Sequence, residues 1–103
     1  MRSVLITIAA VALVPMAAPV AGQGGSNVAR SLAAGCANCH GTNGVSTGEV
    51  ASLAGRPKDE IARKMHDFKA GRAAGTIMPQ LAKGYTDEQI DAVAEWFAAQ
   101  RAK

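Results

Sequence analysis

One pentapeptide, Cys36-Ala37-Asn38-Cys39-His40, constrains this 103-residue chain more than any other stretch. The spacing C-x-x-C-H is the attachment signature of a c-type haem. In a helical turn the two sulfurs lie three residues apart on one face, where each can form a thioether to one vinyl group of the porphyrin. The imidazole of His40 follows on the same surface and is an ordinary axial ligand of haem iron. The sequence therefore predicts one haem c, attached through Cys36 and Cys39 and ligated by His40.

Other interpretations of the two cysteines fit less well. A thioredoxin-like C-x-x-C pair belongs in a βαβ pattern, and the sequence shows no alternating strands. A zinc site is disfavoured because the chain holds only two Cys and two His. The separation of His40 and His66 also matches no common zinc-finger spacing. A disulfide between Cys36 and Cys39 would close a very short loop and would stabilise the fold little.

Residues 1–22 have the pattern of a secretory signal peptide. Arg2 provides a positive charge, an uncharged apolar run follows, and the segment then becomes small and proline-containing toward a cleavage site near Ala21 or Gly22. An uncleaved membrane anchor is the alternative, but the apolar run is short for a bilayer span and the segment contains Pro15. After cleavage no membrane span is expected. The sequence thus predicts export to the periplasm, with residues 23–103 forming one cytochrome c domain.

The 81 residues that follow the predicted signal peptide form a small domain, whose core is marginal without help. Burial of a porphyrin, a large apolar plate, would replace part of the missing core, so the haem-free chain is expected to be partly or wholly unfolded. The mature charge is about +2, from ten Lys and Arg (eleven less Arg2) against eight Asp and Glu. Two haem propionates would bring this charge near zero, and no basic run is present, so nucleic acid is not an expected partner.

Helical periodicity predicts an all-α domain with three main helices. The first begins at Ser26 or Asn27 and ends near Gly35, and the second covers residues 57–70. The third begins after Thr86 with the pattern of a capping box. Apolar stripes of the second and third helices are expected to face the core or the haem. The aromatic residues of the third helix are expected to pack on the alanine face of the first.

Met78 is the candidate for the second axial ligand. It lies in residues 72–80, which we expect to be non-helical, and Pro79 restrains the backbone of Met78 to an extended conformation. A methionine ligand stabilises the ferrous state and raises the reduction potential. Met65 falls in a helical stripe and is expected to pack in the core. The alternatives to Met78 are an open or water-bound sixth site and ligation by His66, which is expected to be exposed.

Over nearly its whole mature length the chain resembles the class I c-type cytochromes. The resemblance rests on the run from Cys36 to Gly41, on Leu53-Ala54-Gly55, on residues 68–72, on Met78 and on residues 86–100. It implies an all-α class I cytochrome c-like fold, with crossing terminal helices and three main helices wrapped around one covalently bound haem. Two shorter runs, residues 76–78 and 82–87, look like the cytochrome subunit of flavocytochrome c sulfide dehydrogenase.

The resemblance also implies a partner for the imidazole N–H of His40. In many members a proline carbonyl accepts this hydrogen bond, and the corresponding residue here is Ala51. The carbonyl of Ala51 can still accept the bond, but the loop loses a conformational restraint.

The function implied is the transfer of single electrons by one haem that alternates between ferric and ferrous states. The chain can do this as a free diffusible carrier, or as the non-catalytic haem subunit beside an FAD-containing sulfide dehydrogenase subunit. A ligand-binding or peroxidatic haem protein, which needs an open sixth site, is the alternative from another class, and a metal-free thiol switch is a third. Basic residues in the middle of the chain and acidic residues in its last helix either steer docking to redox partner proteins or form two solvated faces.

Overall fold

All regular elements in the part of the chain that the structure describes are helical, as predicted. The structure is a computed structural model, and it describes residues 9–13, 15 and 23–102. The predicted signal peptide lies mostly outside these residues. Among the described helices, none has the length and apolar character that a bilayer span requires. The elements in chain order are α1 (Gln23–Ala34), α2 (Ala37–His40), the 3-10 helix η1 (Thr42–Gly44), α3 (Lys58–Lys69), α4 (Met78–Ala82) and α5 (Asp87–Ala98).

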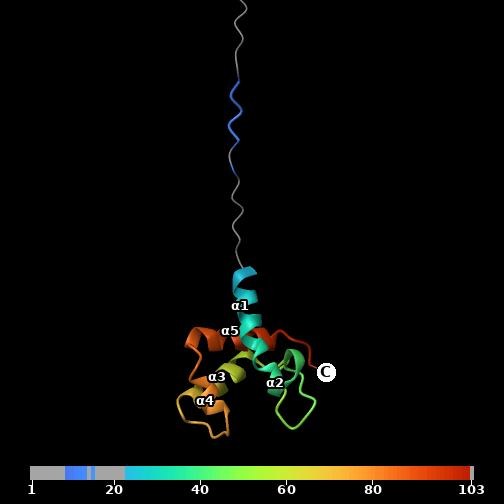
Figure 1. Cartoon of the computed structure of the whole chain (residues 1–103), viewed down its shortest axis with the longest axis vertical. Helices are drawn as coiled ribbons and strands as arrows, with labels where there is room; N and C mark the ends of the chain where they lie inside the picture. The colour runs from blue at the N-terminus through green and yellow to red at the C-terminus, as the bar shows by residue number, and fades with distance from the viewer. Residues whose placement is uncertain (1–8, 14, 16–22, 103) are drawn as a thin grey trace, which may run out of the picture.

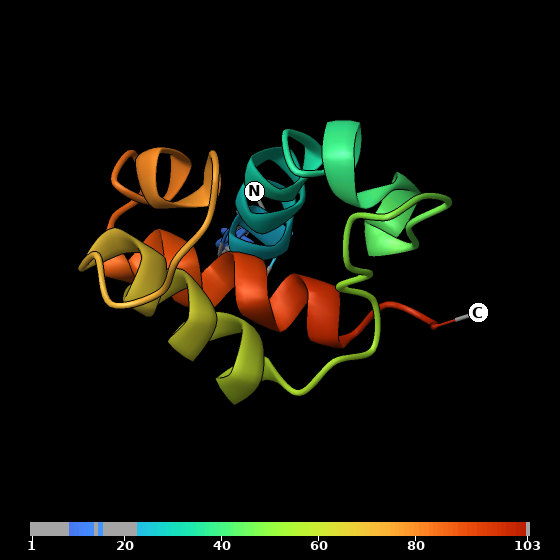
Figure 2. The same cartoon turned by 90° about the horizontal axis from the view of Figure 1, so that it is seen from below.

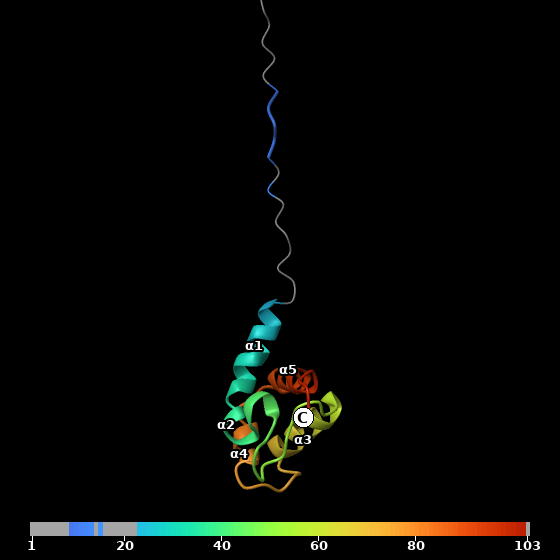
Figure 3. The same ribbon diagram turned by 90° about the vertical axis from the view of Figure 1, so that its right-hand side faces the viewer.

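The core forms where α1 crosses α5 and α3 runs beside α5 (Figure 1, Figure 3). One buried cluster joins Ala33 of α1, Ile61 of α3, and Val93, Ala94 and Phe97 of α5. The small side chain of Ala33 lets the two terminal helices approach closely, and this confirms that Phe97 packs on the alanine face of α1. Only two large side chains of the described residues are fully buried, Phe97 and Ile90. Such a small core fits a domain that needs a further apolar group for stability.

The start of α5 has the capping box that the sequence predicts. The hydroxyl of Thr86 accepts a hydrogen bond from the backbone N–H of Gln89 at 3.1 Å. The side-chain carbonyl of Gln89 accepts the N–H of Thr86 at 2.9 Å. Two backbone donors that a helix N-terminus leaves unpaired are thereby satisfied. The start of α1 differs from the prediction, because this helix begins at Gln23, before the expected caps. Serine and asparagine cost little inside a helix, so a cap signal does not compel a helix to begin there.

The prediction that Met78 lies in a non-helical segment was wrong, because Met78 is the first residue of α4. The N–H groups of Gln80 and Leu81 both donate to the carbonyl of Ile77, at 3.0 Å each, and close the first turn. Proline is tolerated in this turn because the first N–H groups of a helix have no intrahelical acceptor. Pro79 therefore helps to begin a short helix here and does not exclude one.

Basic residues of α3 and acidic residues of α5 lie against each other and do not form two separate faces. Lys69 Nζ lies 3.0 Å from an oxygen of Asp87, and Lys58 Nζ lies 3.6 Å from an oxygen of Glu95. These pairs join the two ends of α3 to α5. Some of the charged residues that were considered for docking to partner proteins thus form ion pairs within the domain.

His66 of α3 faces the start of α5 and is half-buried, so the expectation of an exposed side chain was wrong. Its Nδ1 lies 3.6 Å from an oxygen of Asp87, and its Nε2 lies 3.5 Å from an oxygen of Asp91. The side chain of His66 thus lies in the seam between α3 and α5. Both ring nitrogens of His66 therefore face carboxylates of the domain itself.

Candidate haem site

The two cysteines and His40 lie on one helical turn, as the motif predicts. Cys36 directly precedes α2 with helical backbone angles (φ −73°, ψ −26°). Its carbonyl accepts the N–H of Cys39 at 3.2 Å and the N–H of His40 at 2.9 Å. Cys36 is half-buried and packs against the core cluster, whereas Cys39 is exposed. No disulfide joins the two sulfurs, so each is available for a thioether.

The imidazole of His40 is oriented by a carbonyl of the following loop. Its Nδ1 lies 2.6 Å from the carbonyl oxygen of Ala51. A carbonyl oxygen only accepts hydrogen bonds, so Nδ1 carries the proton and the lone pair of Nε2 is left for a metal. This contact confirms that Ala51 can accept the bond although it is not a proline. An N–H bond of this kind fixes the ring and makes the imidazole a more basic ligand.

Gly41 lets the chain leave the attachment turn. Its backbone angles (φ 85°, ψ 164°) lie in a region that is open almost only to glycine. A Cβ at this position would also overlap the carbonyl of Val45. The next turn, η1, is closed by bonds from Gly44 N–H to the Gly41 carbonyl at 2.9 Å and from Val45 N–H to the Thr42 carbonyl at 3.0 Å. The sequence analysis named Gly41 only as the end of the attachment run, and the structure adds that its conformation forms part of the site.

Met78 and the attachment turn lie at opposite sides of the domain, on the same face of α5. Figure 2 shows α4 and α2 on either side of α1, and Figure 1 shows both below α5. Met78 is half-buried at the start of α4. The neighbouring Ile77 and Leu81 are apolar and 56% and 46% exposed. An apolar plate that extends from α2 toward α4 would cover such side chains, so the residues present fit a haem.

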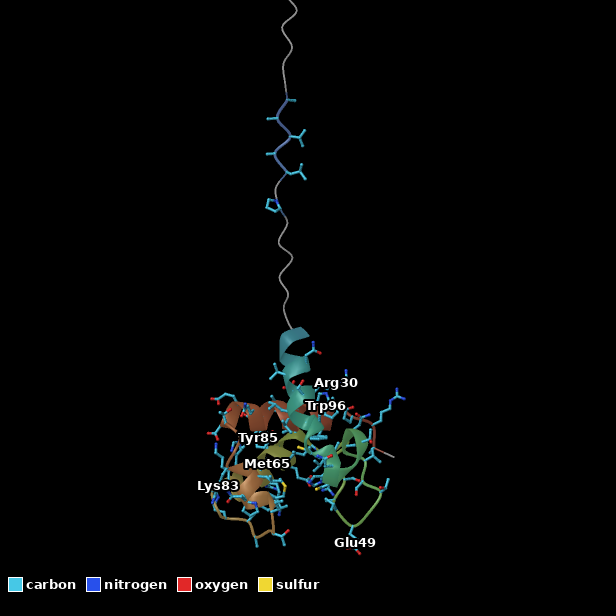
Figure 4. All side chains as sticks on the ribbon, viewed as in Figure 1. Arg30, Glu49, Met65, Lys83, Tyr85 and Trp96 are labelled. Atoms are coloured by element: carbon cyan, nitrogen blue, oxygen red, sulfur yellow. The ribbon has the colours of Figure 1, made fainter. Side chains whose placement is uncertain are left out.

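The Cys36 thiol lacks the lowered pKa of a reactive redox cysteine. Burial raises the pKa of the Cys36 thiol above its ordinary value, and the neighbouring Cys39 adds to the rise. A reactive C-x-x-C pair needs a lowered pKa, because the thiolate is the nucleophile. The pKa of Tyr85 is also raised, first by burial and then by Cys36. Figure 4 shows Tyr85 above α4.

Arg56 makes its contacts within the domain. Its Nε donates to the carbonyl of Ser52 at 2.7 Å, and its terminal guanidinium nitrogen lies 2.7 Å from an oxygen of Glu60. These contacts hold the loop between η1 and α3 to the start of α3.

Comparison with known proteins agrees with this geometry. A family model described as cytochrome c oxidase, cbb3-type, subunit III matches residues 23–97. The chain belongs to this family of c-type cytochromes. Family membership implies a covalently bound haem c, and the cytochrome has two cysteines in its whole sequence, Cys36 and Cys39.

Three individual proteins are similar in sequence to this chain. The cytochrome is 42% identical over 66 residues to the cytochrome subunit of sulfide dehydrogenase from Chlorobaculum tepidum, a match that covers 64% of this chain and 60% of that protein. It is 36% identical over 74 residues to the thiosulfate dehydrogenase electron acceptor of Stutzerimonas stutzeri, with 70% of this chain and 33% of the relative covered. Cytochrome c4 of Pseudomonas aeruginosa is 31% identical over 79 residues, with 76% and 39% covered. The chain thus spans less than two thirds of the length of each of these relatives.

Proposed function

We propose that this cytochrome transfers single electrons in the periplasm, with one haem c attached through Cys36 and Cys39 and ligated by His40 and Met78. The observation that supports this most directly is the orientation of His40. The turn that holds both cysteines also holds an imidazole whose Nδ1 is bonded to the Ala51 carbonyl, which leaves Nε2 for iron. When bound, the haem supplies the one-electron change between ferric and ferrous iron.

The residues of the chain then set the reduction potential of the haem. Met78, at the start of α4, supplies a thioether that favours the ferrous state. The bond from His40 to Ala51 makes the imidazole more basic and favours the ferric state. Cys39 is exposed and borders an open pocket together with residues 41–43, 45–48 and 99–102. A redox partner can therefore approach the attachment turn from this side.

A matched pair of methionine variants tests the axial ligand. Met78→Ala should lower the reduction potential and let the ferrous protein bind carbon monoxide, because the sixth position opens. Met65→Ala removes the same side chain from α3, where Met65 is half-buried, and should leave both properties unchanged. An unchanged potential in Met78→Ala, or equal effects in the two variants, would contradict ligation by Met78.

We further propose that the cytochrome works beside an FAD-containing sulfide dehydrogenase subunit. The 42% identity to a cytochrome subunit of sulfide dehydrogenase supports this partner. A free diffusible carrier is the second candidate, because another relative is named as the electron acceptor of a dehydrogenase. Periplasmic export agrees with the pattern of residues 1–22, and the mass of the mature N-terminus would test cleavage near Ala21 or Gly22.

Purification from the native periplasm under conditions that keep complexes intact distinguishes the two partners. Haem and flavin absorbance are recorded together across a size-exclusion column. Flavin that co-elutes with haem at a fixed ratio would support the enzyme complex, and sulfide should then reduce the haem. Haem in a monomeric fraction without flavin would reject the complex and support a diffusible carrier.

A further inference from the structure

The carbonyl that orients His40 comes from an exposed residue in a segment without regular structure. Ala51 lies between η1 and α3, and Figure 4 shows Glu49 of the same segment at the tip of the loop. Exposed loops of this kind are mobile unless their own bonds hold them. A hydrogen bond of 2.6 Å to His40 therefore requires that the loop be fixed close to Ala51.

Two sets of bonds hold the residues directly after Ala51 to the turn before the loop. After it, the N–H groups of Leu53 and Ala54 donate to the carbonyl of Gly44, at 2.8 and 3.1 Å. Across it, the hydroxyl of Ser52 accepts the backbone N–H of Ser46 at 2.9 Å, in a half-buried setting. The second bond closes the loop from residue 46 to residue 52, and Ala51 lies inside that loop.

Ser52 is held through its carbonyl as well as its hydroxyl. Arg56 Nε donates to this carbonyl at 2.7 Å. The peptide group between Ala51 and Ser52, which carries the Ala51 oxygen, thus lies directly before a residue anchored at two atoms. A rotation of that peptide would turn the oxygen away from His40, and the anchored Ser52 opposes it.

We propose that Ser52 is the positioning residue for the axial histidine, with its hydroxyl closing the loop that aims the Ala51 carbonyl at His40 Nδ1. This inference rests on the proposed role of His40 as an iron ligand. Loss of the Ser52 hydroxyl weakens the bond to Nδ1 and makes the imidazole less basic, so the ferric state loses stabilisation. The reduction potential then rises, while Cys36, Cys39 and His40 themselves are unchanged.

Three variants of the holoprotein test the proposal. Ser52→Ala should raise the reduction potential and speed the exchange of the His40 Nδ1 proton with solvent about tenfold, as expected when a bond of this strength is lost. Ser46→Ala is the matched control, because it keeps the backbone N–H that Ser52 accepts and removes only the weak contacts of the Ser46 hydroxyl with Gly48, at 3.3 and 3.4 Å. Ser52→Thr keeps a hydroxyl, so its reduction potential and its Nδ1 proton exchange rate should return toward those of the parent protein. An unchanged potential in Ser52→Ala, or an equal change in Ser46→Ala, would overturn the proposal.

A measurement on the parent protein keeps the proposal testable even if Ser52→Ala does not retain haem. Hydrogen exchange of the holoprotein should show the Ser46 amide and the His40 Nδ1 proton both protected, with similar opening free energies, because one loop controls both. Free exchange of the Ser46 amide beside a protected Nδ1 proton would refute the role of Ser52. Such a result would leave the electron-transfer function standing, whereas absence of haem from the purified parent protein would instead reject the proposed function.

Discussion

Replacement of Gly41 by alanine should disrupt the attachment turn and with it the haem site. An alanine at φ 85° and ψ 164° is strained by about 1–3 kcal/mol from the backbone alone. Its Cβ would also overlap the carbonyl of Val45, so the start of the loop must move. A domain of this size has a total stability near the low end of about 5–15 kcal/mol, so the combined cost is a large share of it.

A displacement of Val45 would affect the axial histidine, His40, through the loop that Ser46 and Ser52 close. Val45 is the residue before Ser46, whose N–H closes the loop that presents Ala51 to His40. We therefore expect Gly41→Ala to yield less haem per chain, and to unfold at a lower urea concentration in the fraction that retains haem. Haem content is read from absorbance against protein mass, and unfolding from the fluorescence of the single Trp.

Gly48→Ala is the matched control in the same loop. A Cβ at Gly48 meets nothing within 4 Å. Its effect should lie between zero and a gain of about 1 kcal/mol, because alanine restricts the unfolded chain. Equal haem content and equal urea midpoints in Gly41→Ala and Gly48→Ala would refute this account of the attachment turn.

Three further outcomes follow from the packing and charges of the domain. Phe97→Ala should lower the free energy of unfolding by about 3–5 kcal/mol, as measured in urea, and Phe97→Leu should lower it less because it leaves a smaller cavity, since Phe97 is fully buried. The hydrogen bond and charge of Lys69 lower the pKa of Asp87, with a smaller effect of His66. As pH falls, the Asp87 carboxylate therefore takes up a proton in the unfolded chain before it does so in the folded protein. The stability that Asp87 contributes is present above about pH 4, and it is lost as pH falls through the lower pKa of the folded state. Asp87→Asn should thus unfold at lower urea than the parent at pH 7 and at the same urea in strong acid; a pH-independent difference would contradict this assignment. Finally, chemical removal of haem should abolish the near-ultraviolet circular dichroism, because the remaining core is small, and a haem-free chain that unfolds cooperatively would contradict this.

Features set by short-range chemistry could be predicted from the sequence. The attachment turn needs only the spacing of Cys36, Cys39 and His40, and the structure has that turn. The capping box at Thr86 is likewise a contact between residues three positions apart. Helical periodicity also identified the α3 and α5 stripes that meet in the core. In each case the interacting groups are close along the chain or repeat along one helix, so residue types alone specify them.

Local rules failed where two weak preferences competed. Pro79 disfavours a helical residue before it, but it also fits the first turn of a helix, and the structure has α4 beginning at Met78. Glu60 lies four residues from Arg56, which precedes α3, and four residues from Lys64 within α3, and it pairs with Arg56. Sequence spacing permits a helical or a non-helical Met78, and it permits either partner for Glu60. Only the surrounding structure selects one outcome in each case.

The sequence by itself therefore determined the cofactor chemistry, the helical class and the residues of the attachment turn, because these depend on neighbours along the chain. Only the tertiary structure decided that His66 faces Asp87 and Asp91, and that Ser52 closes the loop behind His40. These contacts join residues whose approach depends on how helices pack and loops close. Their free energies are small and their sequence signals are weak, so they become visible only when the whole domain is assembled.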